Sequence, residues 1–272
     1  MTTEILTIDK GQCLTDVLPA IPANTIFDKT ITGCGATHSE IVNAARHSII
    51  IEPNIPVILG KKAEHPFLFA VYEGITKEDV KAYLAGEHDG YRKIITTPEG
   101  FDKKVLPAMH ELEIPVYKDY FLLFDECEKA IQDVGYRGDI YLPVEDFFKF
   151  ENKAMVSATP IVPSDPRFGE NGFKILKLVP TYDSRIELTL CTTNNTVAVM
   201  RKLLKRLENE TVCVFLNSTE TILSLIYALR LQGRSRVFCS EKSVRKLKQM
   251  NFTDASETLD ELAPVNFLTS RF

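Results

Sequence analysis

The sequence predicts an α/β fold in which helices cover both faces of a parallel sheet. Short apolar runs alternate along the chain with helical patterns, which favours mixed layers over separate all-α and all-β parts. Most of the runs are apolar throughout, as strands buried on both faces are. The length of 272 residues exceeds the roughly 100–200 residues that one core usually serves, so about two domains are expected.

The elements can be assigned in chain order from these patterns. Each strand is an apolar run followed by a turn or a polar residue, and each helix lies between two such runs. The predicted strands are Ser48–Glu52, Phe67–Val71, Lys93–Thr96, Tyr120–Phe124, Ala154–Ser157, Lys174–Leu178 and Thr211–Leu216. The predicted helices are Thr37–Ala45, Thr76–Ala85, Phe101–Leu112, Thr193–Leu207, Thr219–Gln232 and Lys242–Met250.

The best boundary between two domains lies near Pro180–Thr192, because a fresh series of helices and strands begins after Thr192. We therefore predict a first domain at 1–181 and a second, partial domain at 186–272. A β-like run begins at Val265–Phe272. Two or three strand–helix units would leave sheet edges uncovered, so we expect the second domain to continue beyond Phe272.

The composition excludes a disordered or fibrous chain, since 44% of the residues are hydrophobic and 25% are charged. The net charge of −5 shows no basic excess of the kind that indicates nucleic-acid binding. The charge is uneven, however. From Ile186 onward 12 basic residues face 9 acidic ones, which is compatible with a phosphate-facing second half without requiring one.

The six cysteines are scattered and include no CxxC pair, which argues against a disulfide framework and a zinc site and fits a reducing compartment. No signal peptide and no apolar run of about 20 residues is present in the sequence. These features predict a cytoplasmic protein without a membrane partner.

A glycine-rich turn is the first segment with chemical meaning. Thr30–Thr37 (TITGCGAT) is a Gly-x-Gly turn that enters a predicted helix. Such glycines let backbone N–H groups curl around a phosphate. Alone the signal is weak, because an ordinary turn between strand and helix has the same composition.

Two strand ends supply the other candidate groups. Phe121–Glu128 (FLLFDECE) is an apolar strand that ends in acidic residues. There Asp125 is suited to hold Mg²⁺ and Glu126 to orient or deprotonate a water, although an ordinary solvated strand end has the same pattern. Met155–Thr159 (MVSAT) is a strand that ends in small hydroxylic residues, a common feature that means little by itself.

Taken in this order, the three segments resemble those of the superfamily-two helicases, the DEAD/DEAH-like group with tandem RecA-like domains. Ile94–Gly100 (IITTPEG) resembles a further segment of that family. The resemblance covers nearly the whole chain and implies a RecA-like parallel sheet of the P-loop NTPase type, followed by a second, truncated RecA-like domain. It also implies ATP and Mg²⁺ as cofactors and nucleic acid as a partner.

The resemblance assigns roles to individual residues. The implied catalytic residues are Asp125 and Glu126, the nucleotide-binding residues are Gly33, Gly35 and Thr37, and Thr37 and Asp125 hold the metal. The implied nucleic-acid-binding residues are Thr97, Pro98, Glu99, Gly100, Ser157 and Thr159.

The departures from the family pattern limit these roles. The phosphate-binding lysine of the family is Ala36 here, which removes the cation that neutralises the β- and γ-phosphates. Lys29 lies seven residues before Ala36, and its reach into the loop is not fixed by the sequence. Glu128 replaces the last residue of the family's acidic box, and the family's arginine finger would lie beyond Phe272.

The sequence therefore predicts a helicase-like protein that binds nucleic acid, with a degenerate nucleotide-binding loop and weak or lost ATPase activity. Two alternatives stay open. One is an inactive helicase-fold scaffold or partner-binding module of a mobile-element or phage replication system, and the other is an active ATP-dependent helicase that uses another cation. The basic runs Arg201–Arg206 and Lys242–Lys248 fit both a nucleic-acid surface and solvated helix faces. For His38, a capping or solvated role is favoured over catalysis.

Overall fold

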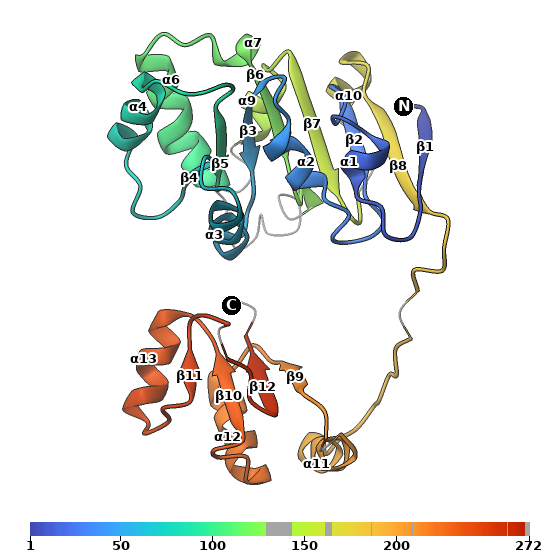
Figure 1. The fold of residues 1–272 in the computed structure, drawn as a ribbon, viewed down its shortest axis with the longest axis vertical. Helices are drawn as coiled ribbons and strands as arrows, with labels where there is room; N and C mark the ends of the chain where they lie inside the picture. Colours follow the sequence, from blue (N-terminus) through green and yellow to red (C-terminus); the bar gives the residue numbers. More distant parts are fainter. Residues whose placement is uncertain (129–142, 161–164, 186, 208, 260, 270–272) are drawn as a thin grey trace. The chain divides into compact units, whose positions relative to one another are not determined.

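The computed structural model describes residues 1–128, 143–160, 165–185, 187–207, 209–259 and 261–269. The chain divides into two compact units, Met1–Ile186 and Glu187–Phe272 (Figure 1). The division lies within the boundary region expected from the sequence. That the units correspond to two helicase domains stays a prediction.

Unit 1 is built on a sheet that has eight strands within the described residues, and every pair of neighbouring strands in it is parallel. The order across the sheet is β1-β8-β2-β7-β6-β3-β5-β4. Because all strands run the same way, their carboxyl ends form one edge, called here the carboxyl edge. The strands are β1 (Thr3–Ile8), β2 (Thr25–Asp28), β3 (His47–Ile51), β4 (Phe69–Val71), β5 (Lys93–Thr96), β6 (Tyr120–Phe124), β7 (Asn152–Ser157) and β8 (Lys174–Pro180).

Both faces of this sheet are buried, because successive residues of a strand point to opposite faces. Along β3, Ile49 and Ile51 belong to one apolar cluster and Ile50 belongs to another. The first cluster includes residues of α4 and α6, and the second includes residues of α1, α2 and α3. The α/β fold class expected from the uninterrupted apolar runs is thereby confirmed.

The helices of unit 1 lie between its strands in the chain (Figure 1). The stretch from Pro98 to Glu111 is continuous and contains one π-helical turn, in which the N–H of Leu106 bonds to the carbonyl of Phe101. Pro107 follows, and it has no N–H to donate in the regular pattern. The helical elements are α1 (Leu14–Val17), α2 (Ala36–Val42), α3 (Ile55–Glu64), α4 (Lys77–Ala85), α5 (Pro98–Gly100), η1 (Phe101–Val105), α6 (Leu106–Glu111), α7 (Val116–Asp119), α9 (Pro143–Phe147) and α10 (Pro166–Glu170).

A buried group of polar side chains, called here the closed cluster, ties α2 to the amino ends of β3 and β5. It consists of Glu40, Arg46, Ser48 and Lys93. Arg46 donates from Nε and Nη2 to the Glu40 carboxylate at 3.1 and 2.5 Å. Ser48 donates to the same carboxylate, and Lys93 Nζ donates to Ser48 Oγ at 2.8 Å. The closed cluster thereby fixes where α2 lies against the sheet.

Unit 2 contains, in its described part, a four-stranded parallel sheet in the order β11-β10-β12-β9. The sequence predicts that a strand begins at Val265, and Val265–Leu268 form β12, which lies between two other strands of this sheet. The elements are α11 (Thr196–Arg206), β9 (Val212–Phe215), α12 (Thr219–Leu229), β10 (Ser235–Phe238), α13 (Glu241–Gln249), β11 (Ala255–Ser256) and β12 (Val265–Leu268).

The predicted strands and helices are all present, with ends that differ by a few residues. The sequence patterns did not identify β1, β2 or α3. The sequence also favours an exposed loop at Tyr136 and Arg137, after the acidic residues that follow Phe124, but these positions lie outside the described residues.

Candidate functional site

Charged and hydroxylic side chains gather where the central strands of unit 1 end. Lys29 follows β2, and Asp125 and Glu126 follow β6. Thr37 enters the same place from the first turn of α2. These four residues are called here the open cluster. They lie at the carboxyl edge, where open parallel α/β sheets bind their ligands.

The glycine turn predicted from the sequence has a backbone that only glycine adopts readily. Gly33 and Gly35 have φ angles of 76° and 88°, in the left-handed region, which side chains disfavour. Gly35 immediately precedes α2. The turn therefore runs from β2 into α2 through two positions at which a larger residue would be strained.

The two acids predicted to be catalytic adopt different conformations. Asp125 is buried, and its backbone N–H donates to the carbonyl of Ile51 at 2.9 Å, which continues the pairing of β6 with β3. Glu126 has a φ of 50°, which is uncommon for a residue with a side chain. Its own N–H donates to Asp125 Oδ1 at 2.9 Å. Thr37 Oγ1 donates to Asp125 Oδ2, so the predicted metal-binding pair is in contact.

Lys29 reaches both acids across the end of β7. Its backbone N–H donates to the carbonyl of Ser157, while its Nζ lies 2.6 Å from Glu126 Oε1 and 3.4 Å from Asp125 Oδ1. The residue is 8% exposed. Burial lowers the pKa of the Lys29 ammonium, but the two carboxylates outweigh burial and raise it above its usual range. The sequence left the reach of this lysine open, and the structure gives its ammonium two acidic partners.

The open cluster lines a pocket of about 420 Å³, which the glycine turn and the start of α3 also line. Glu52, at the end of β3, is 2% exposed and belongs to this pocket. Burial and the nearby Asp125 carboxylate raise the pKa of Glu52 to about 7, against the hydrogen bonds that it accepts from Asn54. Sequence reasoning missed Glu52, although an acid directly after the run of three isoleucines at residues 49–51 was the available signal.

Ala36 lies where the family pattern places a lysine, and its side chain is part of an apolar cluster. Ala36 and Cys34 are 4% and 5% exposed and pack in the same cluster as Ile41 of α2. This position therefore contributes packing and no charge. His38, two residues after Ala36, has its Nδ1 3.2 Å from Nε2 of His65. This contact does not indicate a catalytic role for either histidine.

The turn at Thr97–Gly100, predicted to contact nucleic acid, follows β5 and is tightly built. Thr97 Oγ1 accepts from the N–H of Gly100 at 3.0 Å. A Cβ on Gly100 would lie 2.5 Å from Thr96 Oγ1 and 3.2 Å from the carbonyl oxygen of Val71, so the turn has no room for a side chain there. Thr97, Pro98 and Gly100 are buried and Glu99 is half-buried. Their contact with nucleic acid stays a prediction.

The Ser157–Thr159 segment continues β7, the strand between β2 and β6. Ser157 is fully buried, and its Oγ accepts from the N–H of Thr159 at 2.9 Å. The Ser157 hydroxyl also bonds to Glu128, whose pKa is raised by burial. Thr159 is exposed. This segment is thus connected to the acidic box through Glu128, the residue that departs from the family pattern.

The donor set of the open cluster suits Mg²⁺ bound together with a phosphate. Mg²⁺ prefers hard oxygen ligands and is usually held by one or two carboxylates plus substrate phosphates. Asp125 and Thr37 offer a carboxylate and a hydroxyl in contact. Among the described residues, no group of three or more His, Cys, Asp and Glu side chains is placed to hold a metal ion.

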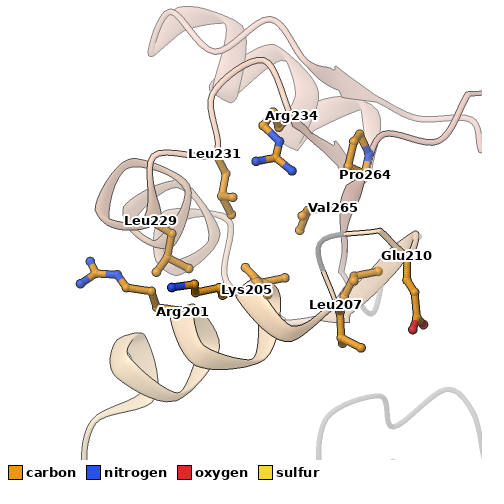
Figure 2. A pocket seen from close by; sticks show the side chains of 11 residues that line it. Arg201, Lys205, Leu207, Glu210, Leu229, Leu231, Arg234, Pro264 and Val265 are labelled. Carbon is orange, nitrogen blue, oxygen red and sulfur yellow. The ribbon is translucent and has the colours of Figure 1, made fainter.

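Unit 2 has a smaller pocket, of about 210 Å³, at the amino ends of β9 and β12. Figure 2 shows Leu229, Leu231 and Val265 around it, with Arg201 and Lys205 contributed by α11. Arg201 Nη2 donates to the carbonyl of Ala228 at 3.0 Å. Because ligands of parallel sheets bind at the opposite, carboxyl ends, this pocket is a weaker candidate than the one in unit 1.

The geometry of unit 1 is that of a RecA-like domain, and comparisons with known proteins agree with it. No protein-family model and no curated protein matches the sequence. Solved structures do match, and they show the RecA-like fold that superfamily-two helicases have.

Two of the matching structures are of Dbp5 from S. cerevisiae. Dbp5 bound to RNA and ADP BeF3 is 13% identical, with a TM-score of 0.53 over 91% of this chain and 66% of that chain. A Dbp5 variant bound to a Gle1 variant and IP6 is 12% identical, with a TM-score of 0.53 over 92% of this chain and 65% of that chain. The chain thus spans just under two thirds of these proteins, and at this identity the match shows the fold alone.

Among the described residues, no helix is both long enough and apolar enough to cross a lipid bilayer.

Proposed function

We propose that the protein is a helicase-like protein that binds nucleic acid and, in unit 1, a nucleotide with Mg²⁺. The observation that carries the proposal is the open cluster: a hydroxyl, two carboxylates and a lysine meet beside a left-handed glycine turn at the carboxyl edge. An ordinary solvated strand end, the competing explanation from the sequence, would leave the acids exposed. Asp125 is instead 2% exposed and lines a pocket.

The nucleotide part of the proposal assigns a role to each group. The glycine turn would offer backbone N–H groups to the phosphates. Thr37 and Asp125 would hold Mg²⁺, and Glu126 would orient a water. Magnesium supplies charge neutralisation of the phosphates when it is bound. Since Ala36 provides no cation at the family's lysine position, we infer that ATP hydrolysis is weak or lost.

The nucleic-acid part is supported by the fold and by surface charge. Dbp5, which shares the fold, has been solved with RNA bound. In unit 2, α13 buries Val244 and Leu247 while its basic residues face outward, and Lys242, Arg245 and Lys246 line a shallow pocket beside Thr219. Lysine and arginine on one face favour binding to a phosphate backbone. We take Lys242–Lys248 as the proposed nucleic-acid surface, in which Arg245 and Lys246 are also paired with Glu241 and Glu220.

The nucleic-acid part can be tested by fluorescence anisotropy with labelled single-stranded RNA and DNA at low salt. We expect binding whose affinity falls steeply as salt rises, because counterions are released from the phosphates. Lys242→Glu should weaken binding several-fold, whereas Lys174→Glu, at an exposed position of β8, should leave it unchanged. Undetectable binding of both nucleic acids would contradict this part and favour the scaffold alternative.

The nucleotide part is tested by titrating the full chain with ATP and ADP, with and without Mg²⁺. We expect magnesium-dependent binding that Asp125→Asn abolishes and that Asp183→Asn, a change at an exposed residue, does not affect. Absence of any nucleotide binding would contradict it. A rate of ATP turnover that Glu126→Gln eliminates would overturn the inference of weak or lost hydrolysis and favour an active helicase.

A further inference from the structure

The Lys29 side chain lies in the candidate site, which could not be predicted from its position in the sequence. It lies before the glycine turn in the chain, yet its ammonium is at the centre of the open cluster, 2.6 Å from Glu126 and 3.4 Å from Asp125. It lines the same pocket as Gly33, Gly35 and Thr37. The lysine therefore faces the space where the phosphates of a nucleotide bound at that turn would lie.

We propose that Lys29 supplies, from the end of β2, a cation that binds the phosphates of the nucleotide, without restoring the lysine of the glycine turn on whose absence the inference of weak hydrolysis rests. The inference rests on the proposed nucleotide binding, and it names the residue that neutralises the terminal phosphates. A lysine ammonium has three donors and acts on phosphate as a point charge. It therefore does not need to extend from the glycine turn itself, provided that it reaches the same space.

The charge balance of the open cluster allows Lys29 to change partners. One ammonium faces two carboxylates, so the cluster keeps an excess of negative charge that a divalent cation can satisfy. When Mg²⁺ is held by Asp125 and Thr37, the carboxylate no longer depends on the lysine. The Lys29 ammonium can then donate to a phosphate oxygen in addition to Glu126, and no new backbone position is required.

The other cations that line the pocket are less suited to this role. Lys61, on α3, is directed to Glu64 at 2.8 Å on the exposed side of the pocket. His38 pairs with His65. The Lys29 ammonium, by contrast, is close enough to the glycine turn to lower the pKa of the Cys34 thiol, partly opposing the rise that burial causes.

A labelling experiment on the unmodified chain distinguishes these lysines. The probe is an acyl phosphate of ATP, whose terminal phosphate carries a biotin-bearing acyl group. A lysine amine beside that phosphate attacks the acyl carbon, an amide bond forms, the acyl–phosphate bond breaks, ATP leaves with the bonding electrons, and the amine proton passes to solvent. Peptide mass spectrometry then locates the label.

We expect the label on Lys29, and we expect excess ADP to block it. Labelling of Lys61 without Lys29, or nucleotide binding without any label on Lys29, overturns the inference while the proposed function stands. A wild-type chain that binds no nucleotide contradicts the proposed function itself, so the two failures can be told apart.

A variant series measures the same contact independently. Lys29→Met should weaken binding of ADP and ATP with Mg²⁺ by at least about tenfold, the loss expected for a charge-assisted bond to phosphate, and leave AMP binding nearly unchanged. Lys174→Met, on an exposed strand position, is the matched control. Equal losses for AMP, ADP and ATP would show a structural role for Lys29 and contradict the inference. Circular dichroism establishes that each variant is folded, and the labelling of the unmodified chain decides the matter if Lys29→Met does not fold.

Discussion

Unit 1 holds two largely buried groups of acidic and basic side chains at opposite edges of the same sheet, and they differ in charge balance. In the closed cluster, one carboxylate, Glu40, faces two cations, Arg46 and Lys93. In the open cluster, one ammonium, Lys29, faces two carboxylates. The two clusters thus contain the same kinds of groups in opposite proportion.

The pKa values of the two lysines follow this balance. Burial is the largest effect on Lys93, and the Glu40 carboxylate does not compensate for it, so the pKa of Lys93 is lowered to about 8. At Lys29 two carboxylates more than compensate for burial. In the closed cluster, the Arg46 guanidinium stacks on the Phe121 ring, 3.4 Å from the ring centre. The open cluster instead lines a pocket. A buried cluster of charged side chains therefore indicates a binding site when its charges do not balance and it lines a pocket that a ligand of opposite charge can enter.

The largest expected effect comes from breaking the closed cluster with Glu40→Ala. Removal of the one carboxylate leaves the buried Lys93 and the half-buried Arg46 without a partner charge, which should cost about 3–5 kcal/mol of unfolding free energy. Urea unfolding monitored by circular dichroism measures it. Glu4→Ala, which breaks the exposed pair with Lys174, should cost less than about 1 kcal/mol. Similar losses for the two variants would show that the closed cluster is not a structural element.

Glu52→Gln should change how stability depends on pH. The pKa of Glu52 in the folded chain is about 7 against an ordinary value of 4.5, so the folded chain takes up a proton that the unfolded chain releases. The resulting stability is complete below about pH 4.5 and is lost as the pH rises through about 7, a change of at most about 3 kcal/mol. The glutamine variant should match wild type at pH 4.5 and exceed its unfolding free energy at pH 8. Glu73→Gln, at an exposed position, is the control, and parallel curves for Glu52→Gln and wild type would be the contrary result.

The smallest expected losses of unfolding free energy come from removing the hydroxyl group of one cluster or of the other. Ser48→Ala removes the buried hydroxyl that bonds to both Lys93 and Glu40 and should cost about 2 kcal/mol, whereas Thr37→Val should cost about 1 kcal/mol. Only Thr37→Val should weaken the magnesium dependence of nucleotide binding. Both are measured by unfolding and by nucleotide titration with and without Mg²⁺. A loss of magnesium dependence in Ser48→Ala as well would remove the distinction between the clusters.

The parts of the fold that could be predicted are those in which burial is visible in the sequence itself. The run at Ser48–Glu52 is apolar because both faces of β3 are covered, and the same holds for Tyr120–Phe124 in β6. By contrast, β2 is four residues long and ends in Asp28, and β1 is an edge strand that mixes polar and apolar residues. The segment that forms α3 contains Pro56 near its start, a residue that interrupts helices in their interior but is well tolerated in the first turn.

The residues of the candidate site likewise include some that the sequence predicts and some that it does not. Thr37, Asp125 and Glu126 could be predicted because each follows a recognisable local pattern. The contact of Lys29 with Asp125 spans 96 positions in the sequence and depends on the order of the strands, which no local pattern contains. The same is true of Glu52, whose pKa depends on the neighbouring strand β6.

The place of β7 between β2 and β6 has a consequence for how the protein is made. Lys29, Thr37, Asp125 and Glu126 are all synthesised before residues 152–157. Strands in a sheet lie about 4.8 Å apart, and β7 sets the two-strand spacing that the Lys29 side chain spans. A nascent chain, or a fragment of residues 1–150, therefore contains every member of the open cluster and still lacks the pocket. The site is completed late in synthesis, by a strand that contributes none of those four side chains.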